Sequence, residues 1–171
     1  MNPRKWKSKL KPRQKKKSDN PKSAALRLLA VRDRSKQELK TRLERRFSPE
    51  ETAETLEYFE EIGYLDDLRF ASNYVQYRNR HRPTGNYLLR LELSSKGIKD
   101  SDIDQVLNSS EREHELALNL VRQRLGRLQR EDALVRVRKI YGLLQRRGFP
   151  GNVARQVVGE LLDTDPENEY N

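Results

Sequence analysis

A fixed interval between apolar residues divides this chain into three similar segments. Two series recur every 51 residues: Phe47, Ile98 and Phe149, and Leu56, Leu107 and Val158. A third series recurs every 46 residues, each member followed by an apolar pair and then an arginine: Ala25, Ala71 and Ala117. The arginines of that series are Arg32, Arg78 and Arg124. Three copies of a three-helix unit explain these intervals, and units too small to hold a core alone are expected to gain one by stacking.

The predicted fold is therefore all-α, with three tandem three-helix repeats of helix-turn-helix-like proportions stacked into an elongated, curved array. The difference between the two intervals is absorbed where the first helix of a unit meets the second, so this junction lengthens from unit to unit. The predicted segments are a disordered basic arm (1–22), three repeats (23–65, 66–109 and 110–162) and an acidic, frayed tail (163–171).

Serine followed three residues later by glutamate predicts the start of several helices. In such a capping box, each side chain accepts a hydrogen bond from the backbone amide of the other residue. Three boxes are predicted: Ser35 with Glu38, Ser48 with Glu51, and Ser110 with Glu113. Residues 63–71 read Gly-Tyr-Leu-Asp-Asp-Leu-Arg-Phe-Ala, which combines a helix stop with a helix start. Gly63 is predicted to end one helix in the left-handed conformation, and Asp66 or Asp67 to cap the next.

Positive charge is concentrated near the beginning of the chain. The net charge is +10 and the pI is near 9.9, and residues 1–22 hold ten basic residues against Asp19 alone. With three prolines and no apolar periodicity, this arm is predicted to be disordered. It would attract polyanions without sequence preference, through residues that include Lys15, Lys16 and Lys17. The alternative is an arm that only keeps the protein soluble.

A second basic region is the last repeat, where residues 110–162 hold 11 basic and six acidic residues. Most of the basic residues fall on its first two predicted helices: Arg122, Arg124, Arg127, Arg130, Arg136, Arg138, Lys139, Arg146 and Arg147. Arginine binds carboxylate and phosphate groups with two parallel hydrogen bonds, so this excess favours a surface for an acidic protein or a nucleic acid backbone. The alternative is a solvated face with ion pairs within each helix.

The side chains offer no constellation for catalysis or for a metal. The chain has no cysteine, and its two histidines, His81 and His114, lie in different repeats and are expected on the surface. Residues 100–111 have the acid spacing of a calcium loop, but Gln105 stands where that loop requires glycine. We therefore expect no enzyme activity, cofactor or metal. Because the sequence lacks a signal peptide and an apolar run of about 18 residues, a cytoplasmic protein without membrane contact is expected.

Several of these motifs together resemble the RecX family, whose members regulate the bacterial RecA recombinase. The resemblance covers residues 24–162 and is carried by Arg32-Asp33-Arg34-Ser35 with Glu38-Leu39, residues 63–71, Lys96-Gly97-Ile98 and Arg147-Gly148-Phe149. One departure is Arg45-Arg46-Phe47, where the family pattern has a glycine before the aromatic residue. The basic arm is not part of the shared pattern.

The resemblance implies a non-enzymatic protein that binds in the helical groove of the RecA filament on single-stranded DNA. Such binding would limit filament growth or promote disassembly, and so damp ATP hydrolysis, strand exchange and the SOS response. The predicted partner-binding residues are basic and frame the helix corners: Arg32, Arg34, Arg69, Arg78, Arg124, Arg146 and Arg147. A monomer is expected, with single- or double-stranded DNA as a second candidate partner. The alternatives are a sequence-independent DNA-binding protein that acts without RecA, and a helical scaffold for an unrelated partner.

Overall fold

The computed structural model describes residues 20–128 and 130–163, and every regular element within them is an α-helix. The first repeat contains α1 (Pro21–Val31), α2 (Lys36–Leu43) and α3 (Pro49–Glu61). The second contains α4 (Asp67–His81), α5 (Asn86–Ser95) and α6 (Asp100–Val106). The third contains α7 (Ser110–Leu128), α8 (Ala133–Arg146) and α9 (Gly151–Asp163).

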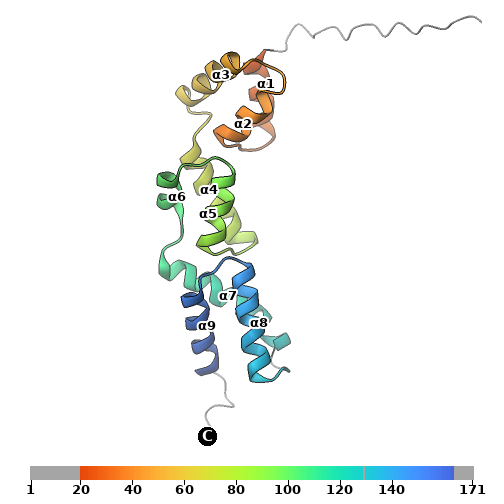
Figure 1. The fold of residues 1–171 in the computed structure, drawn as a ribbon, viewed down its shortest axis with the longest axis vertical. Helices are drawn as coiled ribbons and strands as arrows, with labels where there is room; N and C mark the ends of the chain where they lie inside the picture. The colour runs from red at the N-terminus through yellow and green to blue at the C-terminus, as the bar shows by residue number, and fades with distance from the viewer. Residues whose placement is uncertain (1–19, 129, 164–171) are drawn as a thin grey trace, which may run out of the picture.

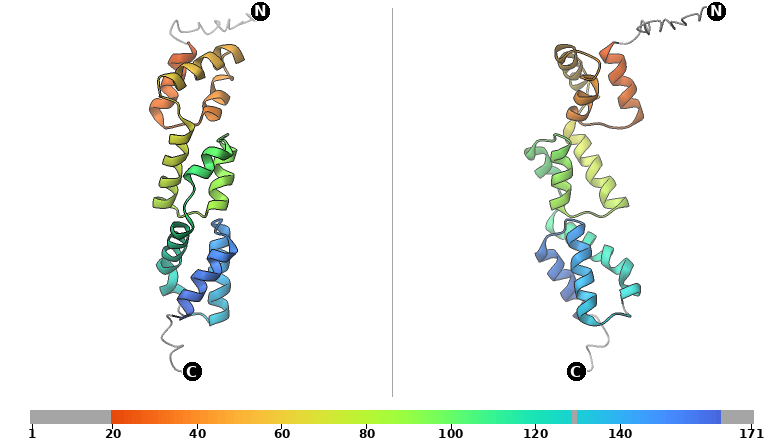
Figure 2. Two further views of the ribbon diagram at one scale, coloured as in Figure 1. Left: turned by 90° about the vertical axis from the view of Figure 1, so that its left-hand side faces the viewer. Right: turned by 45° about the vertical axis from the view of Figure 1, so that its right-hand side comes forward.

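The three repeats follow one another along the long axis of the molecule. The second helix of each repeat (α2, α5 and α8) lies on one side of the array, and the third helix (α3, α6 and α9) on the other (Figure 1). Two further views show the same elongated arrangement (Figure 2). The predicted array of three-helix repeats is confirmed. Residues 164–171 of the acidic tail, and residues 1–19 of the basic arm with Lys15, Lys16 and Lys17, lie outside the described residues.

Each repeat has a hydrophobic core of its own. Two apolar side chains from the second helix are buried in every core: Leu39 and Leu43, Leu89 and Leu93, and Ile140 and Leu144. The helix pairs in extensive contact all belong to the same repeat. The expectation that a repeat gains its core by stacking is therefore wrong, because three helices already enclose one another's apolar faces. The repeats are joined by polar and backbone contacts instead.

Some of the acidic residues at the helix starts cap the helix to which they belong, and others bind elsewhere. Ser48 and Glu51 form the predicted capping box: the Glu51 amide donates to the Ser48 hydroxyl at 3.2 Å, and the Ser48 amide donates to the Glu51 carboxylate at 2.9 Å. Ser35 caps α2 by accepting from the Glu38 amide, but the Glu38 carboxylate binds Arg32 and Lys96 instead of closing the box. The box predicted at Ser110 is wrong by one residue. Ser109 caps α7 by accepting from the Arg112 amide, while Glu113 binds elsewhere.

The first helix also begins earlier than predicted. The Asn20 side chain accepts a hydrogen bond of 2.7 Å from the Ser23 amide, and Pro21 occupies the first turn of α1. Proline suits this position because its missing N–H would have no partner within the helix. Residues 21 and 22, assigned to the disordered arm by sequence, are therefore helical.

The ends of the second helices explain the departure from the family pattern. Leu43 and Leu93 are 50 residues apart, whereas Phe47 and Ile98 are 51 apart, so the end of α2 is one residue shorter than the end of α5. The amide of Ile98 donates to the Leu93 carbonyl across Gly97, which has φ 79°. The amide of Phe47 donates to the Leu43 carbonyl without such a residue. The first repeat thus lacks the glycine position altogether and does not place another residue there.

The second helices are joined end to end at the two repeat junctions. The Ser35 hydroxyl at the start of α2 donates to the Lys96 carbonyl at the end of α5, at 2.6 Å. The Gly85 amide at the start of α5 donates to the Arg147 carbonyl at the end of α8, at 2.8 Å. The positive end of one helix dipole therefore meets the negative end of the next at both junctions.

An acidic residue from the following repeat completes each junction. The Asp67 carboxylate accepts from the Lys36 amide in the first turn of α2, at 2.7 Å. The Glu113 carboxylate accepts from the Asn86 amide in the first turn of α5, at 2.6 Å. Asp67 and Glu113 are 46 residues apart, so the first helix of one repeat caps the second helix of the repeat before it. At the corner of residues 63–71, Asp66 alone caps α4 by accepting from the Arg69 amide at 2.9 Å.

Replacing Glu113 tests this junction. We expect Glu113→Ala to lower the free energy of unfolding by about 1–3 kcal/mol, because the partly buried Asn86 amide loses its acceptor. Glu113→Gln keeps an oxygen acceptor at this position. Burial raises the pKa of Glu113, and the hydrogen bond from Asn86 opposes this shift only in part.

The raised pKa of Glu113 determines how the stability difference between Glu113→Gln and the native protein changes with pH. The stability linked to protonation of Glu113 is present below the unfolded pKa and is lost as the pH rises through the higher folded pKa. Glu113→Gln should therefore gain stability over the native protein as the pH rises from about 4 to about 7. Urea unfolding at the two pH values measures this change, and a difference that did not vary with pH would contradict it.

Candidate functional site

Five of the seven arginines predicted to bind a partner make contacts within the molecule. Arg32 pairs with Glu38 at 2.9 Å, and Arg78 pairs with Glu92 at 2.6 Å. The other three donate to backbone carbonyls: Arg34 to Leu28 at 3.2 Å, Arg69 to Gly63 at 2.8 Å, and Arg147 to Pro83 at 3.3 Å. These arginines therefore hold helix corners and repeat junctions together.

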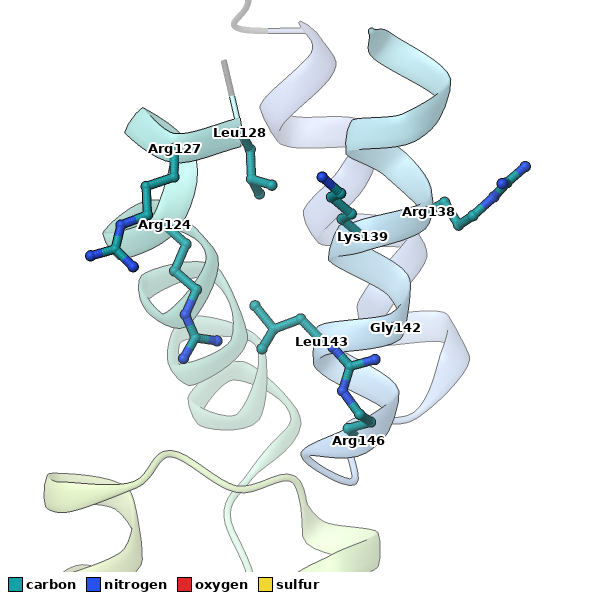
Figure 3. Close-up of a pocket in the computed structure, with 8 residues that line it drawn as sticks. All are labelled: Arg124, Arg127, Leu128, Arg138, Lys139, Gly142, Leu143 and Arg146. Atoms are coloured by element: carbon teal, nitrogen blue, oxygen red, sulfur yellow. The ribbon is translucent and has the colours of Figure 1, made fainter. Parts of the chain in front are cut away.

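The remaining two predicted residues, Arg124 and Arg146, face a groove between α7 and α8. This basic groove has a volume of about 410 Å³ and is lined by Arg124, Arg127, Leu128, Arg138, Lys139, Gly142, Leu143 and Arg146. Leu128 and Leu143 point into the space between the two helices, and Lys139 and Arg146 lie at the α8 side of its opening (Figure 3). Arg138 extends from α8 away from α7 (Figure 3). The groove thus has an apolar floor and a cationic rim.

The rim is poor in carboxylates. Lys139 pairs with Glu131 at 2.5 Å. Arg124, Arg127, Arg138 and Arg146 have no hydrogen-bonded or ionic partner within residues 20–128 and 130–163. A guanidinium group without an internal acceptor is free to bind an external carboxylate or phosphate with two hydrogen bonds.

The repeat register explains why Arg124 lacks a partner on α8. Arg32, Arg78 and Arg124 recur every 46 residues; Arg32 directly follows α1, and Arg78 and Arg124 lie within α4 and α7. In the first two repeats, a glutamate on the second helix neutralises this arginine. Glu92 corresponds, 51 residues later, to Leu143 in the floor of the groove. The substitution leaves the third arginine without its carboxylate and lines the groove with an apolar side chain.

Further arginines gather at the two junctions. Burial lowers the pKa of Arg147, and the nearby positive charges of Arg82, Arg124 and Arg78 lower it further. Burial likewise lowers the pKa of Arg34, with Arg32 and Arg42 as neighbouring cations. Arginine side chains in proteins carry a positive charge at neutral pH. Positive charge therefore extends from the basic groove to both repeat junctions.

Comparisons with known proteins match the three repeats one by one. Family models of the first, second and third three-helix domains of RecX match residues 22–59, 66–107 and 111–158. The chain belongs to the RecX family. The regulatory protein RecX of Chlorobium phaeobacteroides strain BS1 is 36% identical over 139 residues, which cover 81% of this chain and 91% of that protein. The regulatory protein RecX of Amycolatopsis mediterranei strain U-32 is 37% identical over 79% of each chain.

Crystal structures of RecX proteins have the same fold. The RecX of Lactobacillus salivarius superposes with a TM-score of 0.76 at 22% identity, over 82% of this chain and 94% of that one. A second structure, of a regulatory protein RecX, gives 0.71 at 26% identity, over 80% of this chain and 70% of that one. The RecX array of three three-helix domains is therefore shared across these proteins.

Each of the two histidines of this RecX protein contacts a group of its own repeat. His114, expected on the surface, is partly buried and lies 2.7 Å from a Glu160 carboxylate oxygen on α9. Exposed His81 lies 3.0 Å from the Tyr77 carbonyl. In the described part of the chain, no three histidine or acidic side chains lie close enough to hold a metal ion. No helix in that part is both long enough and apolar enough to cross a membrane.

Sequence reasoning identified the basic repeat but missed most of the groove. Arg127, Arg138 and Lys139 were counted in the excess charge and left out of the predicted set. The register would have separated Arg78 from Arg124, because it aligns Glu92, the partner of Arg78, with Leu143. The role of Asp67 and Glu113 in neighbouring repeats was not visible in a capping pattern, which describes only one helix at a time.

Proposed function

We propose that this RecX protein regulates RecA by binding its filament on single-stranded DNA through the basic groove. Binding limits filament growth or promotes disassembly, and thereby reduces ATP hydrolysis, strand exchange and the SOS response. The observation that supports this proposal is a groove at one end of an elongated array, lined by four arginines that have no carboxylate partner among the residues that the structure describes. A long array spans neighbouring subunits of a polymer, which a compact domain of the same mass does not.

The mechanism needs no bond chemistry from this chain. A monomer that binds a filament subunit in one state and not in another shifts the assembly equilibrium by mass action. The guanidinium groups supply charge-assisted hydrogen bonds to carboxylate or phosphate groups of the filament. The apolar floor formed by Leu128 and Leu143 adds buried area for a neighbouring apolar side chain.

The decisive measurement is ATP hydrolysis by RecA on single-stranded DNA during titration with this protein. We expect turnover to fall when the protein is present at less than one copy per RecA, because one bound copy stops growth of a whole filament. A variant that lacks residues 1–19 should keep this activity, since the groove lies in the third repeat. Loss of inhibition in that variant would assign the function to the arm.

A second candidate function is direct binding of DNA without RecA. The arginines at both junctions, in addition to the groove, favour it because a nucleic acid backbone needs a row of cations. In this case turnover falls only when the protein is abundant enough to coat the DNA. Inhibition would then weaken steeply as salt rises, because bound cations release counterions from the phosphates.

A further inference from the structure

The basic groove of the third repeat carries more positive charge than the acidic side chains of its own helices neutralise. In the first repeat Arg32 is paired with Glu38, and in the second Arg78 is paired with Glu92. Their counterpart Arg124 faces Leu143, and no carboxylate from the described residues replaces the missing glutamate. The pattern of the first two repeats indicates that a carboxylate near Arg124 would restore the same local neutrality.

The chain itself contains a segment with the matching chemistry. The acidic tail, residues 163–171, holds four acidic residues and no basic one: Asp163, Asp165, Glu167 and Glu169. It also contains one aromatic residue, Tyr170. Alternating carboxylates suit the cationic rim of the basic groove, and a tyrosine ring suits the apolar floor made by Leu128 and Leu143.

The groove is within reach of this segment. The tail follows α9, which packs against both α7 and α8, the two helices that form the groove. α9 ends at the same end of the molecule as the α7–α8 connection (Figure 1). The residues from 164 to 171 span up to about 27 Å when extended, whereas a helix with its side chains is about 10–12 Å wide. The tail is therefore long enough to pass around one helix and enter the groove.

We propose that the acidic tail docks in the basic groove and competes there with the partner of this protein. The tail supplies the carboxylate that Glu38 and Glu92 supply in the first two repeats. Because it is tethered nearby, its effective concentration is high even though each exposed ion pair is weak. The partner must then displace the tail. This inference rests on the proposed function only in taking the groove as the partner-binding surface.

A spin label on the tail tests the docking directly. The chain has no cysteine, so Asn168→Cys introduces a single labelling site in the full-length protein. We expect the label to broaden the amide signals of residues 124–128 and 138–146 in ¹⁵N-labelled protein. The corresponding helix α2 of the first repeat is the internal control and should stay sharp. The matched control variant carries Asp165→Asn, Glu167→Gln and Glu169→Gln as well, and should lose the broadening.

Competition is tested separately with a fluorescent oligothymidylate as a polyanion probe. The variant with Asp165→Asn, Glu167→Gln and Glu169→Gln, and a chain that stops after Asp163, should both bind the probe about three- to tenfold more tightly than the native protein at low salt. The difference should vanish at high salt. Equal affinity of all three proteins at low salt would overturn the competition, and groove signals that broaden no more than those of α2 would overturn the docking.

The two proposals fail in different experiments. The spin-label measurement contains no RecA, so a negative result removes the docked tail and leaves filament regulation untouched. Normal docking together with unchanged ATP hydrolysis by RecA would instead remove the proposed function and leave the tail as a ligand of the groove.

Discussion

Replacing both Arg124 and Arg146 by glutamate should weaken binding to the RecA filament on single-stranded DNA by about 100-fold or more. A factor of 100 corresponds to about 2.7 kcal/mol, which two reversed charges supply because each removes an attraction and adds a repulsion. Neither arginine has a partner within the described residues, so the substitution breaks no internal contact there. The helical signal in circular dichroism should stay unchanged.

A matched control variant separates the effect of losing the groove arginines from the effect of a lower net charge. Arg122→Glu with Arg155→Glu makes the same change in net charge on the same repeat, at exposed positions that do not line the basic groove. We expect this variant to bind filaments within about threefold of the native protein, because solvent and salt screen remote charges. Equal losses in the two variants would show that binding follows net charge and not the groove.

The sequence predicted the fold because the repeat constrains it strongly. Apolar residues at intervals of 46 and 51 leave little freedom in the number, order and length of the helices. Gly63, with φ 72°, ends its helix as its position after the last apolar residue predicts. From sequence alone, the departure at the end of α2 is explained equally well by a missing residue or by a substituted glycine. The buried leucines of α2 and α5 decide between the two, because their spacing shows that one residue is missing.

The binding residues were harder to predict because arginine serves two purposes in this fold. Arg34 and Arg147 carry the same charge as Arg146, yet their guanidinium groups hydrogen-bond to backbone carbonyls. Local sequence does not distinguish these cases, since the acceptors lie six residues away for Arg34 and 64 residues away for Arg147. The three-dimensional structure shows that Arg34 and Arg147 are engaged within the molecule.

The largest expected loss of stability comes from Gly148→Ala at the second repeat junction. Gly148 has φ 76°, and a Cβ atom there would lie 2.3 Å from the Leu88 Cβ and 2.7 Å from the Leu88 amide nitrogen. The left-handed conformation costs a residue with a side chain about 1–2 kcal/mol, and overpacking costs a further 1–3 kcal/mol. We therefore expect the free energy of unfolding to fall by about 2–5 kcal/mol, measured by urea unfolding.

The same substitution at two other glycines separates the cost of the left-handed conformation from the cost of overpacking. Gly63 has φ 72° with no atom within 4 Å of an added Cβ, so Gly63→Ala should cost only the conformational part, about 1–2 kcal/mol. At Gly97 the added Cβ would meet the Gln37 Cβ at 2.4 Å and the Gln37 Cγ at 2.8 Å, whereas at Gly148 it also meets backbone atoms of Leu88. Gly97→Ala should therefore fall between the other two. Equal costs at all three positions would mean that backbone conformation alone matters and that close approach of the second helices does not.

Because each repeat has a core of its own, damage at Gly148 should also change how the chain unfolds. The third repeat is joined to the second through the start of α5 and the end of α8, and Gly148 lies at that contact. In an array of this kind, cooperativity between repeats depends on the interface between neighbours. Hydrogen exchange should therefore become faster at the Gly85 amide than in the core of the third repeat. Uniform acceleration throughout the chain would show that the repeats unfold as one unit despite the altered junction.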